Sequence, residues 1–314
     1  KKRNGGSAEF TKSAFKWKDG ELYLAKCSKP LPIRWSRTLP KGATPSTVTV
    51  RLDASGRWFV SLLVDDQTIE VLPPTDKQVG IDVGVSRLIS TSDGEKITNP
   101  KHFNRLYKKL KRAQKELSRK IKGSNNRYRA SLKVARIHAK IKDARTDFLH
   151  KLTTRLVQEN SLIAIEELGV RNMIKNRKLA RSISDAAWGE MFQQLEYKCK
   201  WYGRELVRAS RDACSRDSSD FVKIDRFFPS SKRCNHCGFV LEKLPLNVRS
   251  WDCPNCGTRG IDRDINAGKN ILAAGLAVMV CGADIRPDNH GVKGQLQKTS
   301  ERSRRGRKQK PESC

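Results

Sequence analysis

The stretch Val79-Gly80-Ile81-Asp82-Val83-Gly84 is an apolar, glycine-flanked run that predicts a buried β-strand with an aspartate inside it. A carboxylate in such a strand costs free energy unless it is paired or bound to a metal ion. A second strand is expected at Leu88-Ile89-Ser90, before an Asp93-Gly94 turn typical of tight hairpins. The core sheet should therefore contain a strand that carries a candidate functional acid.

Two further acids stand in similar contexts. Glu166 ends the apolar strand expected at residues 162–165, and Asp264 opens a helix expected through Val280. Carboxylates from three distant segments can converge on one site, and their oxygens suit Mg²⁺ or Mn²⁺. Two such ions about 4 Å apart can activate water and stabilise the leaving oxygen in phosphodiester cleavage.

Each acid also has a simpler interpretation. Glu166 or its neighbour Glu167 can be a surface acid, and Asp264 can be only a helix N-cap. Strands like that of Asp82 also open sugar kinases and chaperone ATPases of the actin-like fold. Here the hydroxylated phosphate-binding residues of those proteins are replaced by Val85-Ser86-Arg87, and no adenosine-binding glycine motif follows, so that reading is disfavoured.

Nine cysteines are present, and four of them form two C-x-x-C pairs that are separated by fifteen residues. This spacing predicts a structural Zn²⁺ held by Cys234, Cys237, Cys253 and Cys256. A redox pair is the alternative, but it does not account for two copies. His236, between two better ligands, is not expected to bind the metal.

The charge is strongly positive, with 64 Lys and Arg against 33 Asp and Glu, a formal net charge of +31. Such an excess favours a polyanionic partner, and nucleic acid fits best. An anionic membrane is the rival, yet no apolar run approaches the roughly 20 residues that span a bilayer, and no membrane partner is expected. Without an export signal, we expect a cytoplasmic, nucleoid-associated protein with reduced thiols.

Apolar residues at helical spacing predict two long helices on either side of a break at residues 123–126. Their basic faces, and the basic loop at 171–181, are candidate phosphate contacts, although a solvated helix face is the alternative. The candidates are Lys108, Lys109, Lys111, Arg112, Lys115, Arg119, Lys120, Arg171, Lys175 and Arg177.

Three more elements complete the expected pattern. A hairpin is expected from 47–52 and 58–64, with a boundary at Pro73-Pro74. Ser184-Asp185 is expected to cap a helix running through Trp188 and Trp201. Another strand is expected near 205–207 or 221–224.

A series of motifs in order resembles the TnpB family of transposon-encoded, RNA-guided nucleases, which are related to type V CRISPR effectors. The resemblance covers roughly residues 77–280. Its motifs are Gly80–Gly84, Asp147–Lys151, Ile165–Leu168, Trp188 with Leu195–Lys198, Phe228–Ser231, both cysteine pairs and Asp262–Ala267.

The resemblance implies an α/β, RNase H-like (RuvC) fold with an inserted four-cysteine zinc ribbon and an N-terminal partial, wedge-like β-barrel. It implies Asp82, Glu166 and Asp264 as the catalytic, Mg²⁺- or Mn²⁺-binding acids, with Glu167 and Asp262 as neighbouring alternatives. Guide RNA and target DNA are the implied partners of an RNA-guided, metal-dependent DNA endonuclease. The expected parts are a β-rich region (1–76), nuclease core (77–229), zinc ribbon (230–259), final nuclease segment (260–282) and a basic, disordered tail (283–314).

Two departures from the family pattern leave alternatives open. The first residues resemble the middle of a typical member, so an N-terminally shortened protein is expected. Residues 209–221 look like an extra surface loop. A nuclease-inactive, RNA-guided DNA-binding protein is therefore one alternative. A transposase or a transposase-accessory protein is another, although no His-hydrophobic-His plus tyrosine arrangement is visible.

Overall fold

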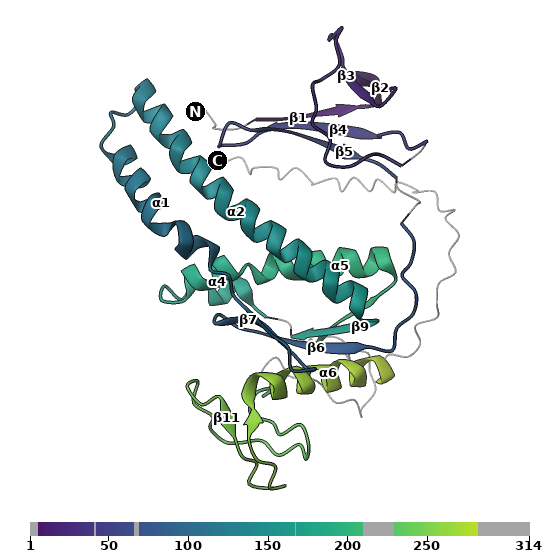
Figure 1. Ribbon diagram of the computed structural model, residues 1–314, viewed down its shortest axis with the longest axis vertical. Coiled ribbons are helices and arrows are strands. Elements are labelled where there is room, and N and C mark those ends of the chain that lie inside the picture. Colours follow the sequence, from purple (N-terminus) through teal and green to yellow (C-terminus); the bar gives the residue numbers. More distant parts are fainter. Residues whose placement is uncertain (1–5, 41, 66–68, 167, 210–228, 282–314) are drawn as a thin grey trace, which may run out of the picture.

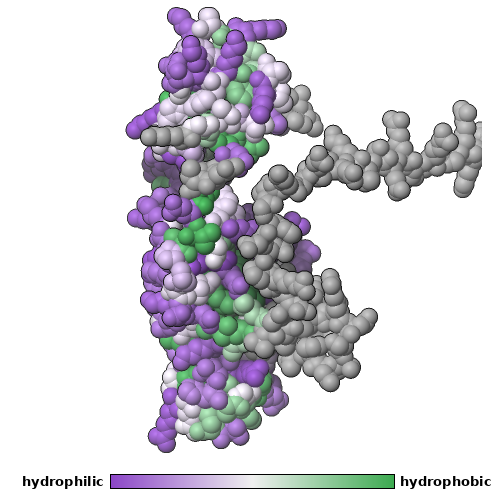
Figure 2. Space-filling model, turned by 90° about the vertical axis from the view of Figure 1, so that its right-hand side faces the viewer, coloured by the Kyte–Doolittle hydropathy of each residue, from purple (hydrophilic) through white to green (hydrophobic). Residues whose placement is uncertain are grey.

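A computed structural model describes residues 6–40, 42–65, 69–166, 168–209 and 229–281. Figure 1 shows a small β region, a central sheet between helices, and a cysteine module beyond the last helix. Hydrophilic side chains dominate the face drawn in Figure 2, as expected of a chain with 31% charged residues. Within the part of the chain that the structure describes, no helix combines the length and apolarity needed to cross a membrane.

The central sheet is mixed and five-stranded, in the order β10-β9-β6-β7-β8. Strands β10, β9 and β6 are parallel, whereas β7 and β8 continue from β6 as antiparallel neighbours. This confirms the strands predicted around Asp82 and Glu166, the turn at Asp93-Gly94 and a strand at 205–207. The strands are β6 (Gln78–Val83), β7 (Arg87–Thr91), β8 (Lys96–Thr98), β9 (Leu162–Glu166) and β10 (Glu205–Ala209).

Helices cover both faces of this sheet (Figure 1). Val79 and Ile81 of β6 pack with α2 (Asn125–Glu159) and α5 (Trp188–Tyr202), whose Leu152 and Trp188 belong to the same buried cluster. The opposite face lies under α6 (Arg263–Cys281), where Ala164 of β9 is buried with apolar residues of that helix. Because side chains alternate along a strand, each face of the sheet has its own core.

Helix α1 (His102–Ser118) and α2 form the predicted helical pair, and Leu110 packs against Ile137 and Ile141 between them. The predicted cap at Ser184-Asp185 is wrong. Both residues lie inside α4 (Ala180–Ala186), and α5 starts after Ala187, whose positive φ of 51° separates the two helices. The Asp185 carboxylate instead accepts hydrogen bonds of 3.1 Å from the Phe103 amide in the first turn of α1.

The N-terminal region forms a three-stranded sheet of β1 (Gly6–Thr11), β4 (Thr47–Leu52) and β5 (Trp58–Leu63). A short helix, η1 (Lys12–Ala14), leads to a hairpin of β2 (Phe15–Lys18) and β3 (Glu21–Leu24), which shares one small core with the sheet. This confirms the predicted hairpin, while the partial barrel stays a prediction. Arg57 before β5 pairs with Asp143 of α2 at 2.6 Å.

The remaining elements are short. They are α3 (Val170–Met173) after β9, and β11 (Ser250–Trp251) paired with β12 (Ile261–Asp262) in the cysteine module. The helix expected through Val280 is confirmed as α6. Ala209, the first residue of the extra loop predicted at 209–221, is instead the last residue of β10. The rest of that loop, the alternative strand at 221–224 and the predicted disordered tail lie outside the described residues.

Candidate acidic site, zinc site and basic groove

Asp82 and Glu166 lie on neighbouring strands and on the same face of the central sheet. The parallel register pairs Ile81 of β6 with Ile165 of β9, so the two acids are the next residues along each strand. Ile81 and Ile165 belong to the core under α2 and α5, so the alternation of the strands turns both acids toward α6. The fold thus brings together two of the three predicted acids.

Helix α6 brings the third acid to this face because it packs unusually close to β6. A Cβ atom on Gly80 would lie 2.1 Å from the Gly268 carbonyl oxygen, and one on Gly268 would lie 2.8 Å from the Ser92 amide nitrogen. Only glycines allow this approach. Asp264 precedes Gly268 by four residues, about one helical turn, so both lie on the side of α6 that faces β6.

Glu166 and Asp264 lie near enough to Asp82 for their negative charges to act on its carboxyl. Burial of the Asp82 carboxyl, with the negative charges of Glu166 and Asp264, raises its pKa to about 7. Burial also raises the pKa of Glu166. An Arg249 nitrogen lies 3.2 Å from Asp264 Oδ1 and offsets part of the negative charge. Neighbouring carboxylates with raised pKa values are suited to binding a divalent cation, because the cation compensates the repulsion among them.

The neighbouring acid Asp262 has a different role. Its Oδ1 accepts the amides of Asp264 and Ile265, each at 3.1 Å, so Asp262 provides the N-cap that was considered for Asp264. Its other oxygen binds Lys96 of β8. Although burial opposes it, these contacts lower the pKa of Asp262. The alternative at Glu167 falls outside the described residues.

The four predicted cysteines meet at one point. Their sulfurs all lie within 4.8 Å of one another, with 3.8 Å between Cys234 and Cys256 and 3.6 Å between Cys237 and Cys253. Four thiolates bound tetrahedrally to zinc at about 2.3 Å have sulfurs about 3.8 Å apart, so this donor set fits Zn²⁺. Four protein donors would leave a bound zinc ion no open coordination position, as in structural zinc sites.

Each cysteine pair forms a tight turn. The Gly238 amide donates to the Cys234 carbonyl at 2.9 Å, and the Gly257 amide donates to Cys253 at 3.0 Å. Both glycines have positive φ, 77° and 70°, a conformation that glycine adopts without strain. His236 is exposed and is not part of the four-residue cluster.

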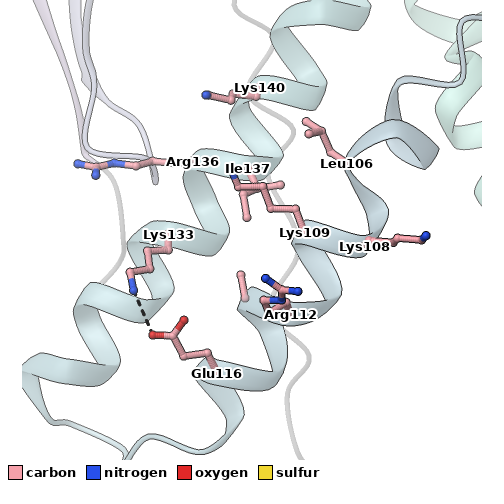
Figure 3. Close-up of a pocket in the computed structure, with 10 residues that line it drawn as sticks. Leu106, Lys108, Lys109, Arg112, Glu116, Lys133, Arg136, Ile137 and Lys140 are labelled. Carbon is pink, nitrogen blue, oxygen red and sulfur yellow. Dashed lines mark hydrogen bonds and ion pairs between the residues drawn. The ribbon is translucent and has the colours of Figure 1, made fainter.

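Half of the ten predicted basic contacts lie along α1, and three of these border a groove against α2 (Figure 3). Lys108, Lys109 and Arg112 line it from α1; Lys133, Arg136 and Lys140 line it from α2. The groove has a volume of about 660 Å³ and an apolar floor that includes Leu106 and Ile137. Its one acid, Glu116, is paired with Lys133 at 3.1 Å.

Sequence reasoning missed the three cations of α2. They recur at spacings of three and four residues, which puts them on one face of the helix, so this periodicity was the available signal. Lys111 and Lys115 are exposed on α1 without lining the groove, and Arg119 and Lys120 follow its end. Arg171 lies in α3 and Lys175 and Arg177 follow it, apart from the groove.

Two protein families match segments of this chain. Residues 61–177 match a family described as "Probable transposase", and residues 211–271 match the Cas12f1-like TNB domain. A protein of Streptomyces pristinaespiralis named as a candidate RNA-guided DNA endonuclease is 58% identical over 91% of this chain and 67% of its own length. InsQ of Escherichia coli K12, named likewise, is 34% identical over 72% of this chain and 56% of its own length.

A solved structure of a Cas12f1–sgRNA–target DNA complex contains a chain that aligns with 85% of this one and 59% of itself, with a TM-score of 0.49 and 17% identity. The sequence matches place the chain among the proteins encoded by transposons. More narrowly, it belongs to the TnpB family. The chain spans 67% of the length of the Streptomyces relative and 56% of InsQ.

Proposed function

We propose that this chain is the nuclease part of an RNA-guided DNA endonuclease, with a RuvC-type site formed by Asp82, Glu166 and Asp264. The observation that carries the proposal is the convergence of these acids at the ends of β6 and β9 and in the first turn of α6. The sheet order β10-β9-β6-β7-β8, with two antiparallel strands at one side, supports an RNase H-like fold. The domain limits expected from the sequence belong to this proposal.

Within this proposal the three carboxylates hold Mg²⁺ or Mn²⁺. When bound, a pair of such ions supplies a hydroxide nucleophile at neutral pH and stabilises charge on the departing oxygen. Asp82 must lose its proton to act as a ligand, and the positive side chain of Arg263 favours that loss. Arg249, paired with Asp264, keeps a positive charge beside the site where a phosphate would bind.

Guide RNA and target DNA are the proposed partners, in line with the names of the relatives. The cations of the α1–α2 groove and of residues 171–177 would bind backbone phosphates, each contact releasing condensed counterions. Base pairing with the guide would then select the target, while the protein recognises mainly the shape of the duplex.

The test is cleavage of matched DNA by the purified protein with its transposon-end RNA and Mg²⁺. The parent should cut and Asp82→Ala should not, whereas Asp76→Ala, an exposed acid just before β6, should cut like the parent. Equal cleavage by Asp82→Ala would refute the site. RNA-dependent DNA binding without cleavage in any divalent ion would favour the alternative of a nuclease-inactive binding protein.

A further inference from the structure

A pair of buried asparagines on α6 joins the cysteine module to the helix that carries Asp264. Asn266 and Asn270 are only 2% and 5% exposed. Each side-chain nitrogen donates to the backbone oxygens of Ser230 and Arg233, Asn266 at 3.3 and 2.7 Å and Asn270 at 2.8 and 2.7 Å. The Asn266 oxygen accepts the Asn235 amide at 3.0 Å. The Arg233 carbonyl and the Asn235 amide flank Cys234 directly, and Ser230 lies in the turn just before it.

The asparagines hydrogen-bond to the cysteine turn from the side of α6 that faces away from the sheet. Successive residues of a helix are about 100° apart, so Asn266 lies about 200° around the axis from Asp264, while Asn270 shares the side of Asn266. Gly268 and Leu272 lie on the Asp264 side, against Gly80 of β6. A rotation of α6 that moved Asp264 away from Asp82 would therefore break the bonds to the cysteine turn.

We infer that Asn266 and Asn270 are positioning residues through which the zinc-bound turn at Cys234 fixes the rotation of α6, and with it the direction of the Asp264 carboxylate. The inference rests on the proposed acidic site. A zinc ion restrains the Cys234 turn, and the turn offers two carbonyls and an amide in a fixed arrangement that only a correctly rotated helix can match. On the side of the sheet, Asp262 caps the first turn of α6 and is itself held by its ion pair with Lys96.

The alternative is that the asparagines only hold the cysteine module in place. Binding of Mn²⁺ to the whole chain distinguishes these two roles. Binding is measured at pH 8 from the electron paramagnetic resonance signal of the free ion. We expect Asn270→Ala and Asn266→Ala to bind Mn²⁺ about 10- to 100-fold more weakly than the parent, the usual effect of losing a group that orients a metal ligand. Lys269→Ala, exposed between them on the same helix, should bind like the parent.

Zinc content and the melting curve are measured on the same samples. The inference requires weaker Mn²⁺ binding in a variant that keeps its zinc, and Asn270→Ala is the milder test because it leaves all three Asn266 bonds in place. If Asn270→Ala loses zinc and Mn²⁺ binding together, the pair merely holds the module and the inference fails. It also fails if both variants bind Mn²⁺ like the parent while Asp82→Ala does not. If Asp82→Ala itself binds Mn²⁺ like the parent, the proposed acidic site is refuted rather than the role of the asparagines.

Discussion

Asp262 Oδ1 accepts a hydrogen bond of 3.1 Å from the amide of Asp264, so one acid caps the helix whose first turn carries the other. Two aspartates that are indistinguishable by spacing therefore have different surroundings. Asp262 is engaged by Lys96 and by two amides, whereas Asp264 contributes negative charge at Asp82.

Substitutions at these two positions should affect the cleavage rate to very different extents. Asp264→Asn should lower the cleavage rate at least about a hundredfold, since a lost metal ligand removes several kcal/mol of transition-state stabilisation. Asp262→Asn keeps an oxygen that can cap α6, so its rate should stay within about tenfold of the parent, with a lower melting temperature because the contact to Lys96 is lost. Single-turnover cleavage measures both, and equal rates in the two variants would contradict the assignment.

The raised pKa of Asp82, about 7, makes metal-free stability depend on pH. The folded state holds this proton more tightly than the unfolded chain, so the stabilisation is present at low pH and is lost as pH rises through 7. Asp82→Asn, which cannot ionise, should therefore stabilise the metal-free protein relative to the parent at pH 8 more than at pH 5. Urea unfolding in buffers without Mg²⁺ or Mn²⁺ measures this; a pH-independent difference between the two proteins would argue against it.

Divalent-ion binding should show the complementary trend. The ion competes with the Asp82 proton, so affinity should rise between pH 6 and 8 and level off above the pKa. Calorimetric titration with Mn²⁺ at several pH values gives the curve. Asp93→Asn, an exposed acid in the β7–β8 turn, serves as the control and should leave the curve unchanged.

Zinc should be bound in a ratio of one per chain and should depend on each of the four clustered thiols. Cys256→Ser should lose the metal and expose the segment around Trp251 to protease, because the small core of the module includes Cys234 and Cys253 themselves. Cys27→Ser, exposed in the N-terminal region, should retain it. Metal analysis and limited proteolysis provide the readouts, and full zinc content in Cys256→Ser would contradict the four-thiolate site.

Asp185→Ala should destabilise the protein by about 0.5–2 kcal/mol, the usual effect of losing a helix cap. The carboxylate binds the first turn of α1 from α4, so the loss should appear as early exchange of amides around Phe103. Ser184→Ala, at the exposed neighbouring position, is the control. Denaturant unfolding measures the difference, and equal stability of the two variants would show that the cap contributes little.

The α1–α2 groove should contribute to the salt dependence of RNA binding. Each phosphate contact removed by Lys109→Ala or Arg136→Ala should lower the slope of log affinity against log salt by about 0.7 to 0.9. Lys18→Ala, in the β2–β3 hairpin, should not change the slope. Filter binding across a salt series tests this, and unchanged slopes would remove the groove from the interface.

Much of this arrangement was predictable from sequence because it depends on local patterns. Short apolar runs located β6 and β9, and helical spacing located α1, α2 and α6. The cysteine spacing located the metal cluster, since a tight turn between paired ligands leaves little choice of geometry. The predictions that failed involve tertiary contacts. Asp185 looks like a local cap but accepts a hydrogen bond from a distant helix, and the break between α4 and α5 falls on Ala187 rather than on a glycine or proline.

The distinction between Asp262 and Asp264 likewise needed the structure. Both stand at the start of the same apolar helix, and only the structure shows that Asp262 caps it and pairs with Lys96 whereas Asp264 pairs with Arg249. The groove cations of α2 were within reach of sequence reasoning, but Arg136 also reaches the Ser55 carbonyl of the N-terminal region, a contact that no helical pattern encodes.

The chain order of the acids has a consequence during biosynthesis. Strands β6 to β9 and most of the covering helices emerge from the ribosome well before α6, because the cysteine module is translated between them. A nascent chain therefore carries Asp82 and Glu166 while it still lacks Asp264 and the helix that covers their face of the sheet. The order of translation itself delays completion of the acidic cluster until the zinc-binding thiols have already been made.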